Sequence, residues 1–125
     1  MSDELSELAH NIIGGAIEVH RALGPGLLES AYVRCLTKEL RFRGLRVKSE
    51  VEVPIVYRGE RIDCHYRLDL FVEDAIIVEV KSVEHLLPVH SAQVLTYLRL
   101  MQARKTLLMN FSTAVLKAGL KSFVL

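Results

Sequence analysis

Two apolar runs, at residues 67–72 and 76–81, constrain the fold of this chain more than any other feature. Both runs are rich in β-branched and aromatic residues, and a short acidic segment separates them. This pattern predicts two neighbouring β-strands joined by a tight turn. Asp69, Glu79 and Lys81 are charged residues embedded within these runs.

The length of the turn decides whether the two embedded carboxylates meet. Side chains alternate between the faces of a strand, so Glu79 and Lys81 share one face. A two-residue loop would place Asp69 opposite Val78 and separate the carboxylates. A loop with an odd number of residues, or a bulge, would bring Asp69 and Glu79 side by side. We expect the odd-numbered loop.

Two carboxylates that lie side by side in apolar surroundings repel each other and lose hydration. At neutral pH one of them should therefore hold a proton unless a cation lies between them. Mg²⁺ meets this need, because one or two carboxylates hold it together with water and substrate oxygens. Lys81 would then reach a metal-bound water or a phosphate oxygen. Taken alone, the pattern is more typical of an ordinary hairpin with a solvated charged face than of a metal site.

Composition indicates a single globular domain, residues 1–125, with one core. The chain has 125 residues, of which half are hydrophobic and a quarter are charged. Its net charge of +1 excludes an overall basic field for nucleic acid. A local basic cluster is more typical of a solvated helix end than of a phosphate track; it comprises Lys38, Arg41, Arg43, Arg46 and Lys48. No apolar run approaches membrane-spanning length, so we expect a cytoplasmic protein without membrane contact.

The cysteines and histidines do not form a metal-binding pattern. Cys35 and Cys64 lie far apart in the sequence, so we expect two reduced, buried thiols rather than a disulfide or a zinc site. The histidines also lack zinc-like spacing, and His20 is interpreted as a structural residue.

Helical and strand periodicities predict a mixed α/β sheet flanked by helices. The predicted helices cover residues 5–23, 27–43, 89–103 and 113–119. Gly14 and Gly15 lie inside the first helix, where we expect close packing rather than a break. Predicted strands cover residues 47–53, with Pro54 marking an edge or bend, then 55–57, 61–70, 106–111 and 123–125. The strict alternation of residues 61–70 places Ile62, Cys64, Tyr66, Leu68 and Leu70 in the core. The opposite, polar row faces either solvent or a phosphate-binding groove.

Three further residues carry no clear function by themselves. Glu29 lies in the first turn of the second helix, where the helix dipole stabilises a carboxylate. Gln93 and Tyr97 are four residues apart and share one helical face. That face is either solvated or covers the charged face of the hairpin.

Taken together, these motifs resemble those of a known family. The segment Gly26-Leu27-Leu28-Glu29-Ser30-Ala31-Tyr32 matches the motif that names the GxxExxY family, a bacterial and archaeal branch of the PD-(D/E)XK nuclease superfamily. Asp69 followed by Glu79-Val80-Lys81 resembles the superfamily core, and Gln93 and Tyr97 resemble its glutamine-tyrosine motif. The resemblance runs from about residue 12 to the C-terminus. It departs at Leu68, where the superfamily's name places proline.

The resemblance implies a restriction-endonuclease-like fold and a metal-dependent nuclease. Glu29, Asp69, Glu79 and the Val80 carbonyl would hold one or two Mg²⁺ or Mn²⁺ ions. Lys81 would position or help deprotonate the attacking water. Gln93 would orient Lys81 or the phosphate, supported by Tyr97.

The implied partner is nucleic acid, with DNA favoured over RNA. A homodimer acting on two strands would suit so small a nuclease. The alternative is a non-catalytic module that binds nucleic acid or protein on a nuclease scaffold. It is motivated by the near-neutral charge and by the lack of an added DNA-reading element.

Overall fold

The computed structural model describes residues 3–125, which contain one five-stranded mixed sheet and a separate two-stranded hairpin. The strand order of the large sheet is β1 (Val47–Glu52), β4 (Arg67–Val72), β5 (Ile76–Lys81), β6 (Lys105–Asn110) and β7 (Leu120–Phe123). All neighbours are antiparallel except β5 and β6, which are parallel. The predicted mixed sheet is confirmed, with β1 as the expected edge strand.

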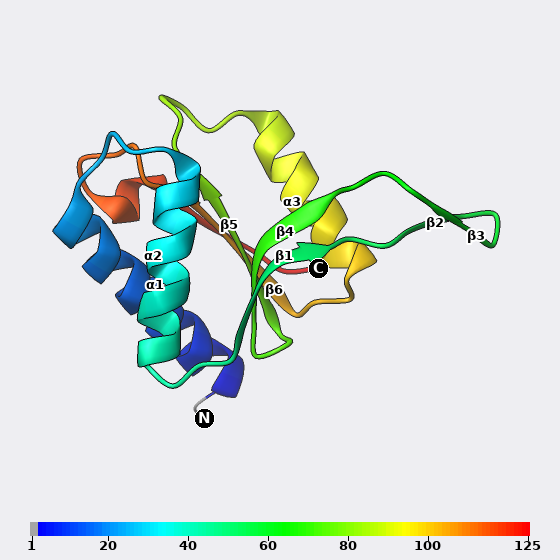
Figure 1. The fold of residues 1–125 in the computed structure, drawn as a ribbon, viewed down its shortest axis with the longest axis horizontal. Helices are drawn as coiled ribbons and strands as arrows, with labels where there is room; N and C mark the ends of the chain where they lie inside the picture. Colours follow the sequence, from blue (N-terminus) through cyan, green and yellow to red (C-terminus); the bar gives the residue numbers. More distant parts are fainter. Residues whose placement is uncertain (1–2) are drawn as a thin grey trace.

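Helices cover both faces of this sheet (Figure 1). Helices α1 (Glu4–Leu23) and α2 (Glu29–Phe42) pack together on one face, and α3 (Pro88–Leu100) lies on the other. Helix α3 provides the crossover that the parallel strands β5 and β6 require. The short helix expected at 113–119 is a 3₁₀-helix, η1 (Leu116–Gly119). None of the described helices is both long and apolar enough to span a membrane.

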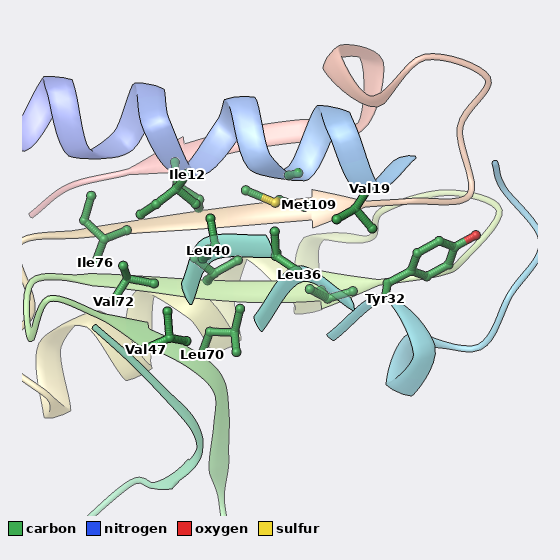
Figure 2. Close-up of a cluster of buried hydrophobic side chains, with 14 of the residues drawn as sticks. Ile12, Val19, Tyr32, Leu36, Leu40, Val47, Leu70, Val72, Ile76 and Met109 are labelled. Atoms are coloured by element: carbon green, nitrogen blue, oxygen red, sulfur yellow. The ribbon is translucent and has the colours of Figure 1, made fainter. Parts of the chain in front are cut away.

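The larger hydrophobic core lies between the sheet and the helix pair α1–α2. Figure 2 shows side chains from both helices and from four strands meeting there, among them Ile12, Val19, Leu36, Leu40, Leu70, Val72, Ile76 and Met109. A smaller core on the α3 side contains Val53, Leu68, Phe71, Ile77 and Tyr97. Strand β6, an internal strand next to the central β5, is buried on both faces, as its continuous apolar run predicts.

The glycine pair in α1 permits close packing against α2, as expected. A Cβ atom at Gly15 would lie 2.8 Å from Cδ2 of Leu40, a fully buried side chain. A Cβ atom at Gly14 would lie 3.1 Å from Nη1 of Arg43, the outer end of a long side chain that bonds to Asn11 and Glu39. The two neighbouring glycines therefore differ in how tightly they are packed.

Residues 61–70 do not form the single strand that their alternation predicts. Strand β3 (Glu60–Ile62) pairs with β2 (Ile55–Tyr57) in a hairpin that projects away from the sheet (Figure 1). Residues 63–66 are irregular, and β4 begins only at residue 67. Ile62, Cys64 and Tyr66 are consequently exposed rather than in the core, whereas Leu68 and Leu70 are buried. The prediction of buried thiols is wrong for both cysteines, although both are free.

We expect Gly15→Ala to lower the free energy of unfolding by about 1–3 kcal/mol, because the buried Leu40 side chain cannot move away without strain. Gly14→Ala is the matched control. It should be neutral or stabilising by up to about 1 kcal/mol, since alanine favours the helix and only the end of Arg43 must move. Urea unfolding measures both effects. Equal stability of the two variants would contradict tight packing at Gly15.

Candidate active site

The loop between β4 and β5 has three residues, 73–75, because Val72 pairs with Ile76. The odd-numbered loop expected from the sequence is thus confirmed. Its register pairs Leu70 with Val78, so the next step along both strands sets Asp69 opposite Glu79.

Ion pairs from the start of the sheet hold this loop. Glu73 and Asp74 both have positive φ angles, 54° and 50°, which L-residues rarely adopt. The backbone and side chain of Arg46 bond to Glu73, and Lys48 bonds to Asp74 at 2.8 Å. These bonds hold the pKa of each loop carboxyl below its ordinary value. The loop acids therefore have structural partners, unlike the acids within the strands.

Asp69 and Glu79 exchange hydrogen bonds with the backbone of the facing strand. The Asp69 N–H donates to Oε2 of Glu79 at 2.8 Å, and the Val80 N–H donates to Oδ2 of Asp69 at 2.8 Å. Each carboxylate thus takes the place of a backbone acceptor where the pairing of β4 with β5 ends. The two acids are fixed between the strands, close to each other.

Burial and mutual repulsion make this pair difficult to ionise fully. Glu79 is only 3% exposed, and burial, followed by the Asp69 charge, raises its pKa to about 8. Burial also raises the pKa of Asp69, opposed by hydrogen bonds from the Val80 N–H and the Glu79 side chain. At neutral pH the metal-free pair therefore retains a proton.

The donor atoms at this point suit a hard divalent cation. They are carboxylate oxygens of Asp69 and Glu79, with the backbone carbonyl of Val80 next to Glu79 along the chain. A cation between the carboxylates would replace the retained proton. Within residues 3–125, however, no three His, Cys, Asp or Glu side chains are grouped closely enough to hold a metal ion. Two of the three predicted carboxylates therefore converge, and Glu29 stands apart.

Glu29 is bound instead to the segment that follows β5. Its Oε2 accepts a hydrogen bond from the Ser82 N–H at 3.2 Å, and the Ser82 hydroxyl donates to the Leu27 carbonyl at 2.7 Å. The Glu29 charge still contributes to raising the pKa of Asp69. Glu29 is thus at the margin of the carboxylate pair, held at the first turn of α2.

Tyr32, the last residue of the Gly26–Tyr32 motif, fastens the loop that leads to Glu29. Its hydroxyl donates to the Gly24 carbonyl and accepts from the Leu27 N–H at 3.1 Å. Its ring is fully buried and stacks on Phe111 with centroids 4.5 Å apart. The tyrosine is therefore a structural part of the motif, a role that the sequence reasoning did not identify.

Lys81 ends β5 beside the carboxylate pair. Its charge lowers the pKa values of both Asp69 and Glu79, which opposes the effect of burial. In the parallel register Lys81 faces Asn110, a buried residue that sequence reasoning missed. The Asn110 amide bonds to both the N–H and the carbonyl of Val83, so it holds the chain just after Lys81. The sequence pattern that could have identified Asn110 is a polar residue at the end of an apolar, buried strand.

Tyr97 of α3 lies close enough to the pair for its phenol to be affected by both acids. With Gln93 and Tyr66 it lines a hollow of about 340 Å³ that neither acid lines. Burial raises the pKa of Tyr97 to about 12, and the Glu79 charge is the next cause, so the phenol stays protonated near the acids. Gln93 makes no hydrogen bond to Lys81 in the described chain. His20, by contrast, bonds through Nε2 to the Thr113 carbonyl at 2.8 Å and is structural, as expected.

In metal-free buffer, the wild-type protein should lose stability as pH rises, and Glu79→Gln should abolish this loss. The pKa of Glu79 lies near 8 when folded, against an ordinary 4.5, so the folded state binds more protons between these values. The free energy of unfolding therefore falls as pH rises through that window. Glutamine keeps an acceptor for the Asp69 N–H but cannot ionise, so the variant should exceed the wild type in stability at about pH 8.

Urea unfolding in EDTA across this pH range measures the effect. Glu84→Gln, which removes an exposed carboxylate with a side chain 92% exposed, is the control and should follow the wild-type curve. A Glu79→Gln variant with the wild-type pH dependence would contradict the raised pKa.

Tyr32→Phe should lower the free energy of unfolding by about 1–3 kcal/mol, because it leaves the partners in the Gly24–Leu27 loop unbonded while keeping the stacked ring. Amide exchange at Leu27 should also accelerate. Tyr57→Phe, at an exposed tyrosine, is the matched control and should change neither quantity. Unchanged exchange at Leu27 in Tyr32→Phe would show that the hydroxyl does not hold the loop.

Comparison with known proteins agrees with this geometry. No curated protein and no solved structure matches the chain. A family model described as the PD-(D/E)XK nuclease superfamily matches residues 6–123, which include both strands of the carboxylate pair and α3. The five-stranded mixed sheet flanked by helices is consistent with the restriction-endonuclease-like fold. The narrower GxxExxY resemblance stays a prediction. The chain belongs to the PD-(D/E)XK nuclease superfamily.

Proposed function

We propose that this protein is a nuclease that hydrolyses phosphodiester bonds and depends on Mg²⁺ or Mn²⁺. The observation that carries the proposal is the reciprocal bonding of Asp69 and Glu79 across β4 and β5, with Lys81 next to them. Members of this superfamily are generally nucleases, and its nucleases typically use divalent metals. Without a cation, burial and mutual repulsion make the fully ionised form of the pair unfavourable. This property is expected of a metal-binding site rather than of a structural hairpin.

Asp69, Glu79 and the Val80 carbonyl would hold the metal ion, with Glu29 joining from α2. When bound, the ion would lower the pKa of a water molecule and stabilise negative charge on the phosphate. Lys81 would hold the attacking water or a phosphate oxygen in position by donating hydrogen bonds. Gln93 would orient Lys81 or the phosphate, and Tyr97 would support it from the same helix.

We favour DNA over RNA as the substrate. The same proposal includes a cytoplasmic location and a homodimer that acts on two strands. A metal ion held by Asp69 and Glu79 would contact only a phosphate, so the carboxylate pair itself does not discriminate between the two polymers.

A non-catalytic binding module is the second candidate. It is favoured by the absence, within residues 3–125, of a group of three side chains able to hold a metal ion. Calorimetric titration of Mn²⁺ distinguishes the two candidates. The nuclease predicts saturable binding that Glu79→Gln abolishes, whereas the binding module predicts nucleic-acid binding that is independent of metal and of Glu79.

We expect Asp69→Asn and Lys81→Ala each to reduce Mg²⁺-dependent cleavage of DNA by at least about 100-fold. Asp69→Asn should also weaken Mn²⁺ binding, while Lys81→Ala should leave it largely intact, because lysine positions water or phosphate rather than the metal. Lys121→Ala, on an exposed position of β7, is the control and should cleave as the wild type does. Undiminished cleavage in either variant of the site would remove this mechanism.

A further inference from the structure

A cleft between α2 and β1 opens beside the carboxylate pair. It has a volume of about 830 Å³, and Glu29 and Asp69 lie among the residues that line it. The α2 wall extends from Glu29, in the first turn, to Arg41, in the last turn. At 1.5 Å per residue this wall is roughly 18 Å long. The cleft therefore leads from the site along a helix.

Three cations line this wall: Arg34, Lys38 and Arg41. Their spacing of four and then three residues places them on one face of α2, over roughly 10 Å of its length. Arg41 is held in place because its Nη2 donates to the Val47 carbonyl at 2.8 Å. The cleft wall thus carries a row of positive charges that starts about one turn from Glu29.

These cations differ from the basic residues that follow them in sequence. Arg43 is paired with Glu39, and Arg46 and Lys48 are paired with the acidic loop between β4 and β5. Between residues 3 and 125, no carboxylate lies within ion-pair distance of Arg34, Lys38 or Arg41. The basic cluster predicted to be a solvated helix end is therefore two groups, one neutralised and one facing the cleft.

The α2 wall of the cleft suits phosphates rather than bases, whereas β1 contributes a carboxylate, Glu50, to the lining. No aromatic side chain lines it, so it has no platform on which bases could stack. Arginine and lysine recognise phosphate oxygens without reading sequence.

We propose that this cleft binds the backbone of one nucleic-acid strand through Arg34, Lys38 and Arg41 and leads it to Asp69 and Glu79 without base selectivity. The inference rests on the proposed nuclease function for its choice of a nucleic-acid ligand. It adds the path of the substrate, which follows α2 away from the carboxylate pair.

The test is the salt dependence of binding by the double variant Arg34→Gln/Lys38→Gln. Arg41 is left unchanged because its guanidinium also bonds to the backbone. The matched control is Arg99→Gln/Lys121→Gln, which removes one exposed arginine and one exposed lysine from α3 and β7. Fluorescence anisotropy of a labelled single-stranded oligonucleotide in EDTA measures binding without cleavage, and urea unfolding verifies that each variant is folded.

The double variant should bind the oligonucleotide more weakly than the wild type does. Its slope of log K, the association constant, against log salt concentration should be smaller in magnitude by about 1.4, because two phosphate contacts on a single strand are lost. The control should keep the wild-type slope. An oligothymidylate, a mixed sequence and an RNA of equal length should bind wild-type protein with similar slopes. A wild-type slope in the double variant, or a strong preference for one base sequence, would overturn the proposal.

Failure of this inference is distinguishable from failure of the nuclease function. If the double variant shows the smaller slope but wild-type protein does not cleave with Mg²⁺ or Mn²⁺, the cleft binds nucleic acid and the nuclease function is wrong. If it cleaves while the double variant keeps both slope and cleavage rate, the substrate path is wrong and the nuclease function stands.

Discussion

The reciprocal hydrogen bonds between β4 and β5 are the interaction on which the site depends. A buried carboxylate is costly unless its oxygens are bonded, and here each acid accepts a backbone N–H of the opposite strand. The polar atoms are thus satisfied, but the two charges are not balanced. The raised pKa of Glu79 is the result of that imbalance. This cost is the physical basis of the proposed cation-binding site.

The pair lies between two strands and adjoins the layers on both faces of the sheet. On the α2 side, Asp69 lines the large cleft together with Glu29. On the α3 side, the charge of Glu79 helps to raise the pKa of Tyr97. The site is therefore enclosed by two helical layers that belong to different parts of the chain (Figure 1).

The near-neutral net charge conceals a separation of charges. The loop acids Glu73 and Asp74 neutralise cations at the start of β1, and the strand acids Asp69 and Glu79 lie side by side. The α2 cations are left facing the cleft. A net charge of +1 is therefore compatible with a local positive surface, because electrostatic interactions with a polyanion act over about a Debye length rather than over the whole molecule.

Local patterns were sufficient to predict the elements that carry the site. Helical spacing and glycine ends indicated α1 and α2, the apolar run indicated β6, and the parity of the hairpin loop placed Asp69 beside Glu79. These predictions succeed because periodicity and loop length act between residues that are near in sequence.

Contacts between distant residues decided the rest. Alternation through residues 61–70 reports which side chains share a face, but not which strand is the partner, so it could not reveal that β3 leaves the sheet for β2. The position of Glu29 depends on a hydrogen bond from Ser82, 53 residues away, and on the bonds of the Tyr32 hydroxyl to the preceding loop. The residues alone thus indicated candidate chemical groups, and the length of one loop brought Asp69 and Glu79 together. The position of Glu29 and the exposure of the α2 cations were set by packing between elements that sequence patterns do not relate.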